Sequence, residues 1–264
     1  MGQAANFKAA GQFLKTLWDE GHRTDHLPEE LRPVSRADGY AIQAGLEDAS
    51  DHPLVGWKIA ATSKAGQEHI NVDGPLAGRI LKETLAMDGA TLSLAGNNMR
   101  VVELEFAFRL GRDLPAREGG YTDAEVRDAV VGLLPALEVP SSRYEDFCVV
   151  GAPALIADNS CAHQFLFGDE IDPALWRDAD LRKQEVTAFV TDKGSFHGIG
   201  ANVLGDPWVA LTWLVNECSE HGVDVKAGQV VSTGTCLVPV PVEEGDELVA
   251  DFGIGGAKLT LRFA

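Results

Sequence analysis

The stretch that decides the fold is Val101-Val102-Glu103-Leu104-Glu105-Phe106-Ala107-Phe108, in which two glutamates interrupt an apolar run. Side chains alternate between the two faces of a β-strand, so the carboxylates of Glu103 and Glu105 would project from the same face. Their Val, Leu and Phe neighbours predict that at least one face is buried. Two like charges one strand repeat apart repel each other where water is scarce. A buried pair therefore requires protons, Lys or Arg partners, or a divalent cation.

A third carboxylate and a lysine stand in similar apolar runs. Glu138 lies within Leu133-Leu134-Pro135-Ala136-Leu137-Glu138-Val139-Pro140, and Lys58 lies within Gly56-Trp57-Lys58-Ile59-Ala60. Three such carboxylates, with water and substrate oxygens, would form the oxygen site that Mg²⁺ or Mn²⁺ prefers. The alternative is a partly exposed strand whose glutamates form salt bridges. Lys58 is either an acid–base or anion-binding group, or an ordinary lysine that reaches water or pairs with a carboxylate.

The composition is that of a globular protein and argues against several functions. The chain has 264 residues, 45% of them hydrophobic and 23% charged, which suits one large domain or a large domain with a small companion. The net charge of −18 at pH 7 argues against a nucleic-acid partner, which would need a basic surface. No stretch has the length and hydrophobicity to cross a membrane, and the start of the chain lacks a signal-peptide pattern, so we expect a cytoplasmic location.

Hydrophobic spacing predicts a mostly helical portion over residues 1–90. Helices are expected over residues 4–19 and, capped by Ser35, through Leu46. A strand over Val55–Thr62 then carries Lys58 and is followed by a short helix over Ser63–Ile70. The segment 71–78, which contains Asp, Gly and Pro, is expected to be a loop.

Residues 91–264 form the second expected portion, which is β-rich. Strands are predicted at Thr91–Leu94, Val101–Leu110, Ala154–Ala157, His163–Phe167, Glu185–Thr191, Gln229–Gly234, Glu247–Phe252 and Ala257–Phe263. Two helices are expected to interrupt them, one from Thr122 through Leu133 and one from Asp206 to Gly222. The glycine-rich segment Gly253–Gly256 joins two strands, so it predicts a hairpin turn rather than a dinucleotide-binding loop.

Several polar segments have two interpretations. Ala157-Asp158-Asn159-Ser160-Cys161 and Ser232-Thr233-Gly234-Thr235 are either turns or sets of hydrogen-bond donors for a substrate carboxylate or carbonyl. Glu68-His69 could contribute an acid or base, although no H-E-x-x-H sequence is present. No G-x-S-x-G elbow or phosphate-binding P-loop occurs either. The four cysteines, which are far apart in the sequence, favour small buried side chains over a metal or redox role: Cys148, Cys161, Cys218 and Cys236.

Four of these segments together carry a resemblance to a known family. They occur in the order Gly56–Ile59, Val102–Phe108, Ala136–Val139 and Ile156–Ser160. In this order and at these spacings, they resemble the branch of the fumarylacetoacetate hydrolase superfamily that contains 2-keto-4-pentenoate hydratase and 4-oxalocrotonate decarboxylase. The resemblance covers nearly the whole chain. Its E-x-E pattern with a later E-V-P does not separate hydratases from decarboxylases.

The resemblance implies an α+β fold, with a helical N-terminal portion and a mixed β-roll-like C-terminal portion. It implies Mg²⁺ or Mn²⁺ bound by Glu103, Glu105 and Glu138. It further implies that Lys58 is the active-site lysine and that Asp73 lies near an acidic position involved in proton transfer. The family forms homo-oligomers. The remaining residues implied at the site would bind substrate, and they are Asn159, Ser160 and Thr233.

The function expected from this resemblance is hydration in aromatic-compound catabolism. The enzyme, a hydro-lyase, would add water to a 2-hydroxy-2,4-dienoate of the 2-oxo-4-pentenoate type and form a 4-hydroxy-2-oxo acid. One alternative is a different reaction at the same metal, either decarboxylation of a 2-oxo diacid such as 4-oxalocrotonate or C–C hydrolysis of an acylpyruvate. A second alternative is a non-catalytic subunit that binds a small acid or supports a partner enzyme.

Overall fold

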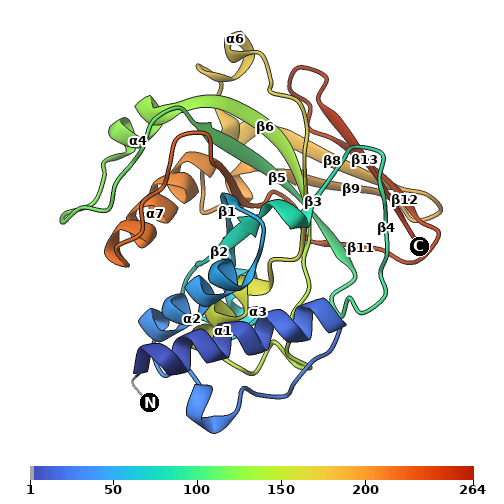
Figure 1. The fold of residues 1–264 in the computed structure, drawn as a ribbon. Coiled ribbons are helices and arrows are strands. Elements are labelled where there is room, and N and C mark those ends of the chain that lie inside the picture. Colours follow the sequence, from blue (N-terminus) through green and yellow to red (C-terminus); the bar gives the residue numbers. More distant parts are fainter. Residues whose placement is uncertain (1–2) are drawn as a thin grey trace.

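A strongly curved mixed sheet forms the centre of this computed structural model, which describes residues 3–264 (Figure 1). Its strands follow the order β2-β1-β10-β5-β6-β7-β3, and β11 also pairs with β5. The pairs β1–β10 and β3–β7 are parallel, whereas the other pairs are antiparallel. The strand bounds are β1 Leu54–Ala60, β2 Leu76–Leu81, β3 Leu85–Ala86, β5 Val101–Leu110, β6 Val130–Val139, β7 Gln164–Phe167, β10 Val230–Thr235 and β11 Val240–Pro241.

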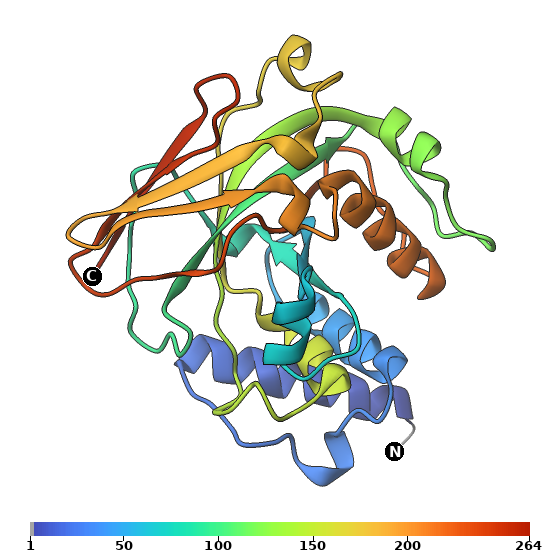
Figure 2. The ribbon, with the colours of Figure 1, turned by 180° about the vertical axis from the view of Figure 1, so that it is seen from behind.

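A second sheet of five strands lies beside the first (Figures 1 and 2). In Figure 1 this sheet is to the right of the view and α7 is to the left. Its order is β4-β13-β12-β8-β9, and β4 and β13 form its parallel pair. The turn at residues 253–256 joins the antiparallel strands β12 and β13, so the predicted hairpin is confirmed. The bounds are β4 Thr91–Leu92, β8 Glu185–Val190, β9 Gly194–Ile199, β12 Glu247–Asp251 and β13 Lys258–Phe263.

The helices begin where the sequence provides capping groups. Ser35 and Asp38 form a capping box at α2, and Thr122 and Glu125 form another at α4. Asp206 caps α7, and Pro207 occupies its first turn. The α-helices are α1 Gln3–Glu20, α2 Arg36–Ala49, α3 Lys64–His69, α4 Asp123–Ala129, α5 Ala152–Ala157, α6 Pro173–Trp176 and α7 Pro207–Glu220, and short 3-10 turns cover Glu29–Leu31, Lys82–Thr84, Asn159–Cys161, Leu181–Lys183 and Gly200–Asn202.

Three expectations about individual elements are wrong, and the strands β6 and β9 were not predicted. Ala154–Ala157, predicted as a strand, lies in α5, which begins after Gly151 at φ 80° and carries Pro153 in its first turn. A short apolar run does not distinguish a strand from a buried helix. The helix predicted through Leu133 ends at Ala129, where the long strand β6 starts. The expected loop over 71–78 gives way to β2 at Leu76.

The overall division into a helical beginning and a β-rich remainder is confirmed, and so is the α+β class. The strands β1 and β2, which precede residue 91, pair within the large sheet. The domain boundary near residue 90 stays a prediction. Three of the four cysteines are buried and all four are free, which agrees with their interpretation as small core residues. None of the helices within residues 3–264 combines the length and the hydrophobicity that a membrane span needs.

The main core fixes which way the central strand faces. Phe106 and Phe108 point to the same side of β5, where they pack against Phe252 and Trp208 at ring-centroid distances of 5.9 and 4.2 Å. Because side chains alternate along the strand, Glu103 and Glu105 must point to the opposite side. The packing of α7 and of the second sheet against one face of β5 therefore leaves both carboxylates on the opposite face.

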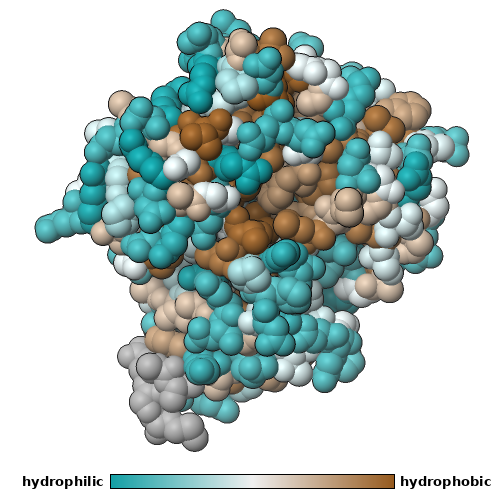
Figure 3. Space-filling model, turned by 45° about the horizontal axis from the view of Figure 1, so that its top comes forward, coloured by the Kyte–Doolittle hydropathy of each residue, from teal (hydrophilic) through white to brown (hydrophobic). Residues whose placement is uncertain are grey.

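One face of the molecule also carries apolar residues on its surface. In Figure 3 they gather near the centre of the view, and hydrophilic residues surround them. Contiguous apolar areas of this kind commonly contact a ligand or a partner.

Helices α1 and α2 pack at their glycines, which yields a testable prediction. A Cβ atom added at Gly11 would lie 2.8 Å from the backbone of Gly45. Gly11→Ala should therefore force the helices apart and lower the free energy of unfolding by about 1–3 kcal/mol, measured by urea unfolding. Gly66→Ala, at a partly exposed helical glycine with its nearest contact at 3.2 Å, is the control and should be close to neutral. Equal effects of the two substitutions would contradict the close helix contact.

Candidate metal centre

Neighbouring strands of the large sheet bring three glutamates together. Glu103 on β5 stands directly opposite Glu138 on β6, and Glu105 lies two residues further along β5. One carboxylate oxygen from each residue lies within 4.8 Å of the other two. Glu105 and Glu138 are fully buried, whereas Glu103 is partly exposed. The three predicted ligands therefore form one cluster with a single accessible member.

Glu105 is oriented by the neighbouring strand β10. Its Oε2 accepts hydrogen bonds from Ser232 Oγ at 2.5 Å and from the backbone N of Gly234 at 2.8 Å. The register of β10 against β5 shifts between Ser232 and Thr235, as in a β-bulge. Gly234 has φ 102°, and a Cβ there would lie 2.3 Å from Thr62 Oγ1, so this position requires glycine. The bulge aims the Gly234 amide at Glu105.

Lys58 reaches the cluster from β1. Its Nζ lies 2.9 Å from Glu138 Oε1 and donates a hydrogen bond to the carbonyl oxygen of Ser160 at 3.0 Å. The side chain is 2% exposed. A Cβ at the opposing Gly78 would lie 3.0 Å from both Cγ and Cδ of Lys58. The glycine therefore provides the space through which the lysine stem passes.

The burial of these groups shifts their pKa values. Desolvation raises the pKa of Glu103 and, together with the charge of Glu103, raises the pKa of Glu105 to about 7, although hydrogen bonds to Glu105 oppose the shift. Desolvation raises the pKa of Glu138 well above its usual value, even though Lys58 lowers it. Burial alone would lower the pKa of Lys58, but Glu138, Glu103 and Glu105 outweigh burial and raise it. Without a cation, the cluster therefore favours protonated carboxyl groups.

The residues fit a divalent cation on three grounds. Glu105 Oε1 and Glu138 Oε2 are buried and have no hydrogen-bond partner among the described residues, although buried polar atoms are normally paired. The ionised cluster and Lys58 together carry two net negative charges, which a divalent cation would balance. Carboxylate oxygens are also the donors that Mg²⁺ and Mn²⁺ favour. This acidic cluster could therefore hold a metal ion.

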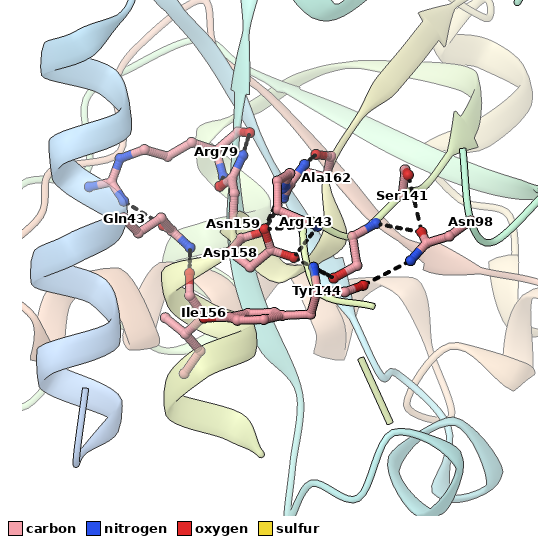
Figure 4. A network of polar contacts seen from close by, with 11 residues as sticks. Gln43, Arg79, Asn98, Ser141, Arg143, Tyr144, Ile156, Asp158, Asn159 and Ala162 are labelled. Carbon is pink, nitrogen blue, oxygen red and sulfur yellow. Dashed lines mark hydrogen bonds and ion pairs between the residues drawn. The ribbon is translucent and has the colours of Figure 1, made fainter. Parts of the chain in front are cut away.

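The other predicted site residues lie in different surroundings. Both groups of the Asn159 amide bond the backbone of Arg79 (Figure 4). Ser160 Oγ donates to the backbone of Ala77. Thr233 Oγ1 donates to the backbone oxygen of Phe106, while its neighbours on β10 contact Glu105. Asp73 is 87% exposed and pairs with Arg36 at 3.4 Å rather than with Lys58. The structure thus brings Lys58 and Ser160 to the glutamates, but not Asp73.

Sequence reasoning missed several residues that shape the site. Ser232 rather than Thr233 reaches Glu105, and the alternation of β10 together with its bulge decides between them. Gly78 lay in a segment interpreted as a loop. Arg143 was not singled out, although it forms a buried ion pair with Asp158. The charged residues in the otherwise small, buried segments Ser141–Arg143 and Ala157–Asp158 were the available signal.

Comparison with solved structures identifies the class of this fold. The fold is close to that of 4-oxalocrotonate decarboxylase from Pseudomonas putida G7, solved with magnesium and adipate, at a TM-score of 0.86. The match covers 98% of this chain and 97% of that one at 24% identity, so it shows the fold alone. The class is thus a β-rich fold with an attached helical portion and a cluster of three glutamates that could hold a metal.

The amino-acid sequence shows the family to which this chain belongs. Residues 62–262 match the family model described as fumarylacetoacetate (FAA) hydrolase C-terminal, and the chain belongs to this family. It is 32% identical to 2-keto-4-pentenoate hydratase of Burkholderia vietnamiensis, over 84% of each chain. It is also 32% identical to 2-hydroxyhexa-2,4-dienoate hydratase of Comamonas testosteroni, over 84% of this chain and 83% of that one. These relatives are hydratases, which are lyases.

The pKa shifts predict how pH and metal act on stability. Because folding raises the pKa of Glu105 to about 7, its contribution to metal-free stability is present below its unfolded pKa and is lost as pH rises through 7. A cation replaces the protons, so Mg²⁺ should raise the melting temperature more at pH 8 than at pH 5.5. Thermal unfolding at both values measures this. Glu105→Gln should lose most of the increase, and an equal increase at both values would contradict the assignment.

The orientation of Glu105 by Ser232 gives a separate prediction. Ser232→Ala removes the hydrogen bond to Glu105 Oε2 and should weaken Mg²⁺ binding about 10- to 100-fold, measured by titration calorimetry. Thr233→Val removes the adjacent buried hydroxyl, which bonds Phe106 instead. It should leave Mg²⁺ affinity within about threefold, well below the loss expected for Ser232→Ala. The reverse order of effects would show that Glu105 is not a ligand.

Proposed function

We propose that this chain is a divalent-metal-dependent hydratase that adds water to a 2-hydroxy-2,4-dienoate and forms a 4-hydroxy-2-oxo acid. The observation that carries the proposal is the buried Lys58, 2.9 Å from Glu138 within a cluster of three carboxylates. The relatives at 30–32% identity support the substrate class, because they are named for short 2-oxo or 2-hydroxydienoic acids. The proposed cofactor is Mg²⁺ or Mn²⁺, held by Glu103, Glu105 and Glu138.

The cation would place positive charge at the substrate's carboxylate and C2 oxygen, where negative charge develops during the reaction. Glu105 would keep its free oxygen toward the cation because Ser232 and Gly234 occupy the other. Glu103, the partly exposed member of the cluster, marks the side from which solvent and substrate can approach. These residues would bind the acid end that the two named substrates share.

Lys58 would carry the proton. Its Nζ has two partners among the described residues, Ser160 O and Glu138 Oε1, and an ammonium group has three hydrogens. The third hydrogen remains for the substrate, to which Nζ would deliver a proton at carbon as the dienol becomes a ketone. Water would then add at the distal carbon. Asp73 remains the proposed second acid–base group, and its exposed position beside Arg36 means that its loop would have to move.

The other roles expected from the sequence also stay predictions. Asn159, Ser160 and Thr233 are proposed to contribute to substrate binding, and for Ser160 the contact of its carbonyl oxygen with Lys58 supports a place at the site. A homo-oligomer in the cytoplasm is likewise proposed.

The experiment that tests the function is a panel of 2-hydroxydienoates and 2-oxo diacids with Mg²⁺ or Mn²⁺, followed by product NMR. We expect 4-hydroxy-2-oxo acids as products. Release of CO₂ from 4-oxalocrotonate would identify a decarboxylase, and cleavage of acylpyruvates a C–C hydrolase. Tight Mg²⁺ binding with no turnover of any of these acids would identify a non-catalytic binding protein.

Lys58→Met provides a test of the proton carrier. Methionine preserves the stem that passes Gly78 but removes the ammonium group. Mg²⁺ affinity should stay the same or increase, because a positive charge leaves the cluster. Turnover should fall by about 100-fold or more, in the range expected for loss of a general acid–base group, and NMR should show slower proton exchange at C3 of a 2-oxo acid. Unchanged exchange would remove Lys58 from the mechanism.

A further inference from the structure

The turn that carries Ser160 has an uncommon backbone. Asn159, Ser160 and Cys161 follow one another with φ values of 54°, 53° and 61°. This left-handed region is rarely occupied by residues other than glycine, and asparagine tolerates it better than serine or cysteine. Such backbone persists where its surroundings hold it firmly, often at functional sites. The contacts of this turn therefore identify what holds it and what it presents.

Arg143 and Asp158 hold both ends of the turn (Figure 4). Asp158 is fully buried, and its carboxylate accepts hydrogen bonds from Ser142 Oγ at 2.6 Å and from the backbone N and Nε of Arg143. The guanidinium group of Arg143 also donates to the carbonyl oxygen of Asp158 and, at 3.0 Å, to that of Ala162. One side chain thus connects the residue before the three left-handed residues to the residue after them.

The turn is also attached to β2. The amide of Asn159 exchanges hydrogen bonds of 2.6 and 2.8 Å with the backbone N and O of Arg79, and Ser160 Oγ donates to Ala77 O at 2.8 Å. These side-chain groups are therefore engaged in fixing the turn. The carbonyl oxygen of Ser160 is the group that the turn presents to Lys58 Nζ, at 3.0 Å.

We infer that Arg143 and Asp158 are positioning residues for Lys58. They hold the turn so that the Ser160 carbonyl fixes the Lys58 ammonium group, which then stands between that oxygen and Glu138. If the turn relaxed, Glu138 would be the remaining partner and the ammonium group would follow that carboxylate alone. The inference rests on the proposed role of Lys58 as the proton carrier. The three glutamates lie on β5 and β6 rather than on this turn, so we expect metal affinity to change much less than turnover when the turn relaxes.

The test uses Asp158→Asn, which keeps the shape of the side chain, and Arg143→Lys, which keeps the charge but loses the span from Asp158 to Ala162. With 2-hydroxypenta-2,4-dienoate and Mg²⁺, each variant should lower kcat about 10- to 100-fold, as removal of an outer-shell partner typically does. The KM for this substrate and the calorimetric Kd for Mg²⁺ should change less than about threefold by the same comparison. If Asp158→Asn does not fold, Arg143→Lys still supplies the measurement.

Asn98→Ala is the matched control. Asn98 supports the same segment through hydrogen bonds to the backbone of Ser142 and Tyr144, but it does not contact residues 158–162. The Asn98→Ala substitution should lower the melting temperature without changing kcat per Mg²⁺-binding site. A second readout is the double variant with Lys58→Met, in which Asp158→Asn should lower kcat no further, because both changes act through one group.

Three results would overturn the inference. The first is an unchanged kcat per Mg²⁺ site in both variants, and the second is a parallel loss of kcat and Mg²⁺ affinity. The third is an additive effect in the double variant. If the wild type turns over no acid in the panel, the proposed function fails instead. Crystal structures then decide the positioning role: Asp158→Asn should separate Lys58 Nζ from Ser160 O, and Asn98→Ala should not.

Discussion

Repulsion among three carboxylates is the constraint on which the rest of this structure depends. At separations within 4.8 Å, each ionised pair costs about 3–4 kcal/mol if the effective dielectric constant is about 20. A hydrogen bond contributes a net of about 1 kcal/mol, so the donors on β10 do not offset this repulsion by themselves. Lys58 compensates one charge. The remainder requires protons or a divalent cation, which is why the cluster is a candidate metal centre rather than a simple salt bridge.

The large sheet satisfies this constraint with residues from four neighbouring strands. The order β1-β10-β5-β6 places Lys58, Ser232, Glu105 and Glu138 on successive strands, and register keeps them on one face. On the other face of β5, Phe106 and Phe108 pack into the core. A slip of one residue would exchange these two sets. The aromatic core therefore secures the register that the charged site needs.

The sequence predicted the parts of the site that depend on local pattern. Alternation in β5 placed Glu103 and Glu105 together, and the apolar surroundings marked Glu138 and Lys58 as unusual. Long-range features were not predictable in this way. The partner of Lys58 is a backbone oxygen at Ser160, whose direction depends on three left-handed residues. The choice of Ser232 over Thr233 depends on a bulge. Short apolar runs were also misassigned, as at α5, because burial in tertiary structure rather than propensity decided their conformation.

The glutamates of β5 and β6 and the lysine of β1 have different roles in the proposed reaction. In the proposed reaction, the carboxylates of β5 and β6 would hold a cation at the part that the relatives' named substrates share, a carboxylate beside a 2-oxo or 2-hydroxy group, whereas those substrates differ at their distal ends. The glutamates therefore do not select among these acids or among reactions that begin with charge at the C2 oxygen. Lys58 approaches from β1, and the turn that presents the Ser160 carbonyl to it is bonded to β2. If Lys58 carries the proton as proposed, the position of its ammonium group relative to the substrate carbons is the feature through which the site would favour hydration over decarboxylation.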